Sequence, residues 1–188
     1  MSRLNTNNII SPSTGTPILQ STGNIVQCNR VRYDSRTTWS SRNNNSATEI
    51  SGLRLSITPR HSGNLLLCQW VLSGDFHHDN VFVIFKNGGL ITSPNSEQGY
   101  NRETGNRRWS GFISSTYDSA SDQSSTPHHW FIQYYANAEN TSNRYYSPAC
   151  KSSSGSNFTL YLNRCGNSNG QNGYETTVST GVIYEITR

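Results

Sequence analysis

Charge is scarce in this sequence. Only 14% of the 188 residues are charged, whereas about 25% is usual for soluble domains, and just two are lysines (Lys86 and Lys151). The sequence has Ser, Thr, Asn, Gly and Tyr where charged residues are usual, so we expect a neutral surface of hydroxyl and amide groups. The net charge of +4 comes from scattered arginines, whereas a nucleic-acid-binding protein usually gathers its positive charge in one patch. We therefore expect no nucleic-acid partner.

Long apolar runs and cysteine motifs are also missing. No stretch approaches the 18 or so apolar residues of a membrane span, and residues 1–10 lack the basic start and apolar segment of a signal peptide. We expect no membrane insertion and a protein that is made in the cytoplasm of its host. The four cysteines form no C-x-x-C pair, which predicts partly buried thiols rather than a disulfide scaffold: Cys28, Cys68, Cys150 and Cys165.

Catalytic signatures are absent as well. The sequence contains no phosphate-binding glycine loop or H-E-x-x-H. The closest candidates for a catalytic acidic pair, Asp118 and Asp122, fall in a Ser-rich loop where Asp is ordinary turn chemistry. We predict that the protein is not an enzyme and needs no cofactor.

Two histidine doublets, His77-His78 and His128-His129, could suggest a metal site, since converging imidazoles bind zinc or iron. On a strand, however, neighbouring side chains point to opposite faces, so a doublet rarely gives two ligands to one ion. We assign no metal site and interpret the doublets as polar strand ends.

Residues 1–24 differ in character from the rest of the chain. They are polar, with Pro12 and Pro17 and the isolated apolar pairs Ile9-Ile10 and Ile18-Leu19. So few apolar residues cannot form a core, and the prolines favour an extended conformation. We predict an N-terminal arm over residues 1–24 and one domain over residues 25–188.

Within that domain, short segments of strand character are separated by clusters of Gly, Asn, Ser and Pro. In residues 53–58 apolar and polar residues alternate, and Pro59 ends the segment. Asn87-Gly88 is a favoured hairpin turn between residues 81–85 and the strand that begins at Leu90. Further candidate strands are residues 65–72, 109–116, 130–135, 158–162 and 178–186. The pattern predicts an all-β, antiparallel, jelly-roll-like sandwich of about eight strands.

Residues 65–72 are apolar almost throughout, which suits a strand covered on both faces. The second cover can be the other sheet or a neighbouring copy of the chain. In the last strand, Val182, Tyr184 and Ile186 fall on one face. The nearly continuous apolar strand at residues 65–72, the many tyrosines and the scarcity of charge predict a sheet face covered by identical neighbours around a threefold axis.

Aromatic residues make up 11% of the chain. Tyr134, Tyr145 and Tyr146 lie beside the most apolar runs and are candidates for a glycan-binding platform, because sugar rings stack on aromatic faces. The alternative is that these tyrosines pack within strands or in a subunit interface, where Tyr is also frequent.

The chain resembles a family of small virion structural proteins of tailed phages, especially cyanophages and other marine phages, described as tail-fibre-like or head-decoration-like. The resemblance runs through residues 50–59, the apolar strand ending at Ser73-Gly74, residues 82–91, and the closing segments 158–164 and 178–186. In order and spacing these segments cover about residues 25–188.

The resemblance implies a homotrimer on the virion surface, attached to capsid or tail proteins as a decoration or fibre-like accessory. The alternative is the receptor-binding tip of a tail fibre, which would bind host surface polysaccharide. The arm also resembles the start of such proteins, where it would anchor the chain to the virion through Leu4, Asn5, Thr6, Ile9 and Ile10.

Overall fold

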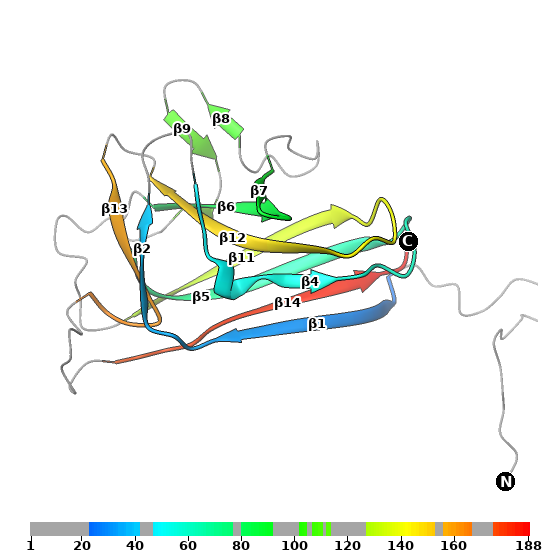
Figure 1. Cartoon of the computed structure of the whole chain (residues 1–188), viewed down its shortest axis with the longest axis horizontal. Coiled ribbons are helices and arrows are strands. Elements are labelled where there is room, and N and C mark those ends of the chain that lie inside the picture. The colour runs from blue at the N-terminus through cyan, green and yellow to red at the C-terminus, as the bar shows by residue number, and fades with distance from the viewer. Residues whose placement is uncertain are drawn as a thin grey trace, which may run out of the picture.

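The computed structural model consists of antiparallel sheets, two of which form the body of the molecule (Figure 1). It describes residues 23–41, 47–76, 80–91, 102–104, 107–110, 112–113, 127–152, 156–166 and 175–188. Within these residues the helical structure is one 3-10 turn, Ser51–Leu53. The expectation of an all-β, antiparallel protein is confirmed.

The first sheet is built around the longest strand, β5. On one edge of β5 lies β14 and, further along, β13, while β11 occupies the opposite edge. β1 pairs with the outer side of β14, and β2 pairs with β13. The strands of this sheet are β1 (Ile25–Tyr33), β2 (Thr37–Ser41), β5 (Leu65–Phe76), β11 (His128–Asn137), β13 (Phe158–Leu162) and β14 (Ser179–Ile186).

The second sheet is centred on β6 and β12, which pair over seven residues. Asn87 and Gly88 have φ values of 52° and 79° and join β6 to β7, so the predicted two-residue hairpin turn is confirmed. The sheet contains β3 (Thr48–Glu49), β4 (Leu55–Ile57), β6 (Asn80–Lys86), β7 (Gly89–Leu90), β10 (Phe112–Ile113) and β12 (Arg144–Ser152). A separate pair consists of β8 (Arg102–Thr104) and β9 (Arg107–Ser110).

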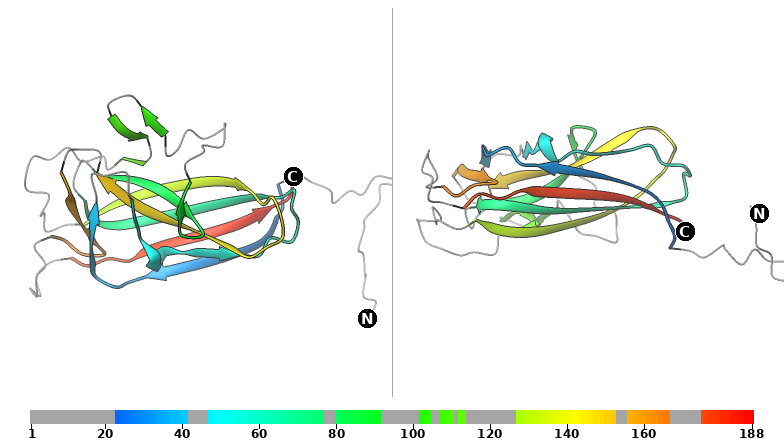
Figure 2. Two further views of the ribbon diagram at one scale, coloured as in Figure 1. Left: turned by 45° about the horizontal axis from the view of Figure 1, so that its top comes forward. Right: turned by 90° about the horizontal axis from the view of Figure 1, so that it is seen from below.

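The core lies between the two sheets, as the layered arrangement in Figure 2 shows. Alternate residues of β5 and β11 point into it and meet apolar residues of β6 and β12. Trp70 is fully buried, and its indole Nε1 donates a hydrogen bond of 2.9 Å to the Leu53 carbonyl. The first sheet contributes Leu66, Cys68, Trp70, Leu72, Trp130, Ile132, Tyr134, Leu160 and Ile183, and the second Phe82, Ile84, Tyr146 and Cys150.

Gly181 on β14 lies against the Trp70 ring. A Cβ atom at this position would lie 2.5 Å from Trp70 Cδ1 and 3.2 Å from Val31 Cγ1. Replacing Gly181 with alanine should therefore lower the free energy of unfolding by about 1–3 kcal/mol, because the buried indole has to shift. Denaturant unfolding measures this. Gly63→Ala is the matched control, since nothing lies within 4 Å of its Cβ position, and equal midpoints for the two variants would contradict the packing argument.

Glu185 ties the segment after β4 to the first sheet. Its buried carboxylate accepts hydrogen bonds from the backbone N–H groups of Arg60 (2.9 Å) and His61 (3.1 Å), from Asn64 Nδ2 (2.7 Å) and from Gln27 Nε2 (2.6 Å). Desolvation raises the pKa of this carboxyl group, but the four donors together outweigh it, so the pKa lies below its ordinary value.

All four cysteines lie in described residues and none forms a disulfide. Cys28 is exposed, whereas Cys68, Cys150 and Cys165 are buried. Desolvation raises the pKa of the Cys150 thiol to about 12 and holds that of Cys68 well above its ordinary value. These thiols are therefore protonated and behave as small apolar core residues.

Several strands differ from the sequence-based expectation. Leu53 belongs to the 3-10 turn, so the alternating segment forms only the three-residue β4. β12 was not predicted, because its buried positions include Arg144, Ser147 and Lys151 among apolar neighbours. The described residues contain fourteen strands rather than about eight, since several are only two or three residues long.

Candidate functional site

The structure places two of the three candidate glycan-binding tyrosines in the core. Tyr134 is 6% exposed and Tyr146 is fully buried, with their ring centroids 5.9 Å apart. Desolvation raises the pKa of Tyr134 to about 12 and that of Tyr146 further. Neither ring presents a face to solvent, so the idea of a surface platform is corrected for both: they fill the space between the sheets.

Tyr145, the third candidate, is half-buried on the second sheet. The Arg54 guanidinium lies 4.6 Å from its ring centroid and covers that face of the ring. Arg54 also donates two hydrogen bonds, of 2.9 and 2.7 Å, to the Glu49 carboxylate. Through these bonds, with a further one from Ser147 Oγ, the pKa of Glu49 is lowered despite its desolvation. The ring is thus part of a packed ion-pair cluster.

The other sequence candidates are distributed as follows. His128 and His129 point to opposite faces of β11: His128 packs edge-on against Trp130, and His129 Nδ1 lies 2.6 Å from Ser73 Oγ. In the described part of the chain, no three His, Cys, Asp or Glu side chains come together as a metal site. The arm residues, the His77-His78 doublet, Asp118 and Asp122 lie outside the described residues: for the arm these are Leu4, Asn5, Thr6, Ile9 and Ile10.

The outer side of the first sheet carries a surface that the sequence analysis anticipated only through residues 65–72. Here β1, β14, β5 and β11 lie side by side, and the right-hand view of Figure 2 looks onto them. No described strand packs on this side. Residues that pair across neighbouring strands point to the same side of the sheet. The strand register therefore defines three rows of outward-pointing residues across the four strands, and we call these three rows the open face. The rows are Arg32, Thr180, Val71 and Phe131; Arg30, Val182, Gln69 and Gln133; and Cys28, Tyr184, Leu67 and Tyr135.

The open face is apolar and aromatic to an unusual degree. Phe131 is 57% exposed and Val71 37%, and they are two of only three large hydrophobic side chains that are exposed among the described residues. An antiparallel sheet with one face in water normally shows polar residues there. The three rows contain no Lys, Asp or Glu, which are the residues depleted from protein–protein interfaces, whereas Arg and aromatic residues are enriched in them.

The polar groups at the centre of the open face are already paired with each other. Gln69 Nε2 donates a hydrogen bond of 2.9 Å to Gln133 Oε1, and Gln133 Nε2 donates one of 2.8 Å to Tyr135 Oη. A surface whose amides are satisfied within the sheet loses little when water is removed from it. This ladder therefore makes the open face suited to being covered.

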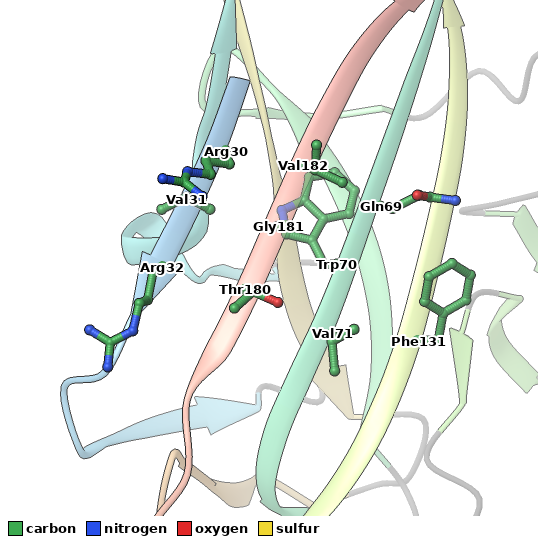
Figure 3. A pocket seen from close by; sticks show the side chains of 10 residues that line it. All are labelled: Arg30, Val31, Arg32, Gln69, Trp70, Val71, Phe131, Thr180, Gly181 and Val182. Atoms are coloured by element: carbon green, nitrogen blue, oxygen red, sulfur yellow. The ribbon is translucent and has the colours of Figure 1, made fainter. Parts of the chain in front are cut away.

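One part of the open face is hollowed. A depression of about 590 Å³ lies over β14 and β5, with Phe131 at one side and Arg30 and Arg32 at the other (Figure 3). Arg32 Nη1 forms an exposed ion pair of 2.7 Å with Asp34. The hollow is large enough for a small ligand or for a side chain of a neighbouring protein.

The signal for this face was present in the sequence. Alternation along residues 128–137 places Trp130, Ile132 and Tyr134 on one side and Phe131 and Tyr135 on the other, so both sides are apolar. The same holds for residues 65–72. The sequence analysis inferred a covered second face from residues 65–72, and the same reasoning applied to residues 128–137 would have added β11 to it.

Comparison with known proteins adds no family to this description. No helix in the described residues is long and apolar enough to span a membrane. No protein-family model matches the chain, and no curated protein matches it either.

Proposed function

We propose that this protein is a structural component of the virion surface of a tailed phage, a capsid-attached decoration or fibre-like accessory protein that works as a homotrimer. Its body is a jelly-roll-like sandwich, and residues 1–24 form the arm that attaches it to other virion proteins. It performs no catalysis and uses no cofactor. The resemblance in the strand segments supports the phage assignment, and the open face supports the assembly.

The open face is the observation that carries this proposal. A monomer in water would expose Phe131, Val71 and the half-buried Tyr184, Leu67 and Tyr135 together. Contiguous apolar surface of this kind marks an interaction site in a soluble protein. We expect the partner at this surface to be another copy of the same chain, because oligomers of identical chains are the commonest soluble assemblies.

The assembly is tested by light scattering. At micromolar concentration, the purified protein is expected to show three times its chain mass of 21.0 kDa. A clean monomer would remove the trimer from the proposal, and a dimer would change its symmetry. Raising the salt concentration is expected to leave the mass unchanged, since apolar contacts are not screened by ions.

The virion assignment is tested on phage particles that carry the protein. Immunogold labelling should decorate particles, and a decoration protein should copurify with tailless heads rather than with isolated tails. Chains lacking residues 1–24 should remain trimeric and lose attachment. Normal occupancy by the truncated protein would place the anchor on the sandwich instead.

A second candidate function, recognition of host surface polysaccharide by a receptor-binding tip, is favoured by the hollow in the open face. Its exposed Phe131 ring and the Gln69 amide are the groups that bind a sugar ring and its hydroxyls. Glycan-array binding that is lost in Phe131→Ala would support this function. An array without binding, for a protein that is trimeric by light scattering, would leave the structural role.

A further inference from the structure

The two edges of the open face have complementary chemistry. β1 carries the cations, since Arg30 and Arg32 both point outward from it. β11, three strands away, carries the aromatic rings of Phe131 and Tyr135. A guanidinium group binds favourably to the face of an aromatic ring, so a β1 edge fits a β11 edge better than it fits another β1 edge.

We propose that identical copies contact each other through the open face around a threefold axis that runs parallel to the strands, with the β1 edge of each copy against the β11 edge of the next. This inference rests on the proposed homotrimer and specifies which surface builds it. Figure 3 shows the two edges on opposite sides of the hollow, with Arg30 and Arg32 on one side and Phe131 on the other.

The choice of axis follows from the charges. Rotation about an axis parallel to the strands brings β1 of one copy beside β11 of its neighbour. A twofold axis that lies in the interface and runs across the strands would instead face β1 with β1. The Arg30 side chains of two copies would then approach each other, and since the three rows contain no Asp or Glu, repulsion disfavours this arrangement.

The strand register gives the arrangement a testable consequence. Rotation about an axis parallel to the strands keeps each row at its own height. Cys28 on β1 and Tyr135 on β11 belong to the same row, through Tyr184 and Leu67. Cys28 of one copy should consequently lie beside Tyr135 of the next, and Cys28 is the exposed cysteine of the chain.

Disulfide cross-linking tests this. Tyr135→Cys, which keeps the native Cys28, should form covalent dimers and trimers under mild oxidation, visible on a non-reducing gel and removed by reductant. The matched control is His129→Cys on the same strand and face, because six residues place it about 20 Å away and a disulfide requires Cα atoms within about 7 Å. It should not cross-link, and neither should Tyr135→Cys combined with Cys28→Ser.

A charge placed in the interface provides the second test. Phe131→Lys should convert the trimer to monomers with unchanged circular dichroism, since the side chain is exposed, the fold does not need it, and its row places the new cation beside Arg32 of the next copy. Thr141→Lys adds the same charge at an exposed position of the loop between β11 and β12, outside the open face, and should stay trimeric.

The outcomes separate this inference from the function on which it rests. A wild-type monomer would overturn the homotrimer itself. If the wild type is a trimer but Tyr135→Cys gives no cross-link, or Phe131→Lys stays trimeric, the open face is not the contact, and the virion role still stands. Cross-linking that stops at covalent dimers would overturn the threefold arrangement.

Discussion

Replacement of Trp70 by alanine is expected to lower the free energy of unfolding by about 3–5 kcal/mol, the usual cost of removing a large aromatic ring from a core. The ring is fully buried between the sheets and contacts both Gly181 and the Leu53 carbonyl. Its loss therefore leaves a cavity and an unpaired carbonyl group together. Urea unfolding monitored by circular dichroism measures the effect.

Two controls separate these contributions. Trp70→Phe keeps most of the ring and removes only the indole donor, so a smaller loss of about 1–3 kcal/mol is expected. Trp39→Ala removes the same ring type at a partly buried position of β2, where its Nε1 bonds to Thr37 Oγ1, and should cost less than Trp70→Ala. Equal losses for Trp39 and Trp70 would show that the core is not centred where the structure places it.

Substitution of Glu185 by leucine is expected to lower the free energy of unfolding by about 3 kcal/mol, because a donor that loses its partner inside a protein costs about 1–3 kcal/mol. Four donors meet at this carboxylate, and Asn64, which supplies one of them, is itself buried. The apolar side chain fills the space and satisfies none of them. Thermal and urea unfolding should agree on the loss.

The same carboxylate makes stability depend on pH in a defined direction. Because its pKa is lowered in the folded state, its contribution is fully present above the unfolded value of about 4.3 and disappears as the pH falls through the folded value. Glu185→Gln should therefore flatten the loss of stability below about pH 4.3. Glu139→Gln, whose carboxylate is 56% exposed, is the control. If the free energy of unfolding falls equally steeply at low pH in Glu185→Gln and in the wild type, this prediction is wrong.

The sequence predicted those parts of the fold in which alternation and turn chemistry act locally. The hairpin at Asn87-Gly88 is one, because positive φ is needed there and these two residues adopt it readily. The strand at residues 158–162 is another, and its bounds agree with β13. In both places the local sequence alone determines the backbone conformation.

The prediction was incomplete where a strand forms only through pairing with segments that are distant in the chain. Residues 144–152 do not read as a strand, since Arg144 and Pro148 interrupt the apolar pattern, and they form β12 through pairing with β6 and β4. Periodicity likewise identified Val182, Tyr184 and Ile186 as one face of the last strand, yet it cannot tell inside from outside. That face is the outer one, while Ile183 and Glu185 are buried.

The candidate site shows the same limit. The sequence indicated an apolar strand covered on both sides, and β5 indeed carries apolar residues on both faces. Which tyrosines reach the surface depends on the packing of β11 against β12, where Tyr134 meets Tyr146. Residue type alone could not separate these buried rings from Tyr135 or Tyr184 on the open face.

The buried thiols can be used to measure how often the two sheets separate. Cys68 belongs to β5 and Cys150 to β12, so each sheet holds one sulfur at the layer where the two meet. A maleimide reacts with the thiolate, which burial suppresses at both positions, and it cannot enter a closed interior. The rate at which these two sulfurs are alkylated, after Cys28 has been blocked, would thus measure how often the sheets separate in the native state.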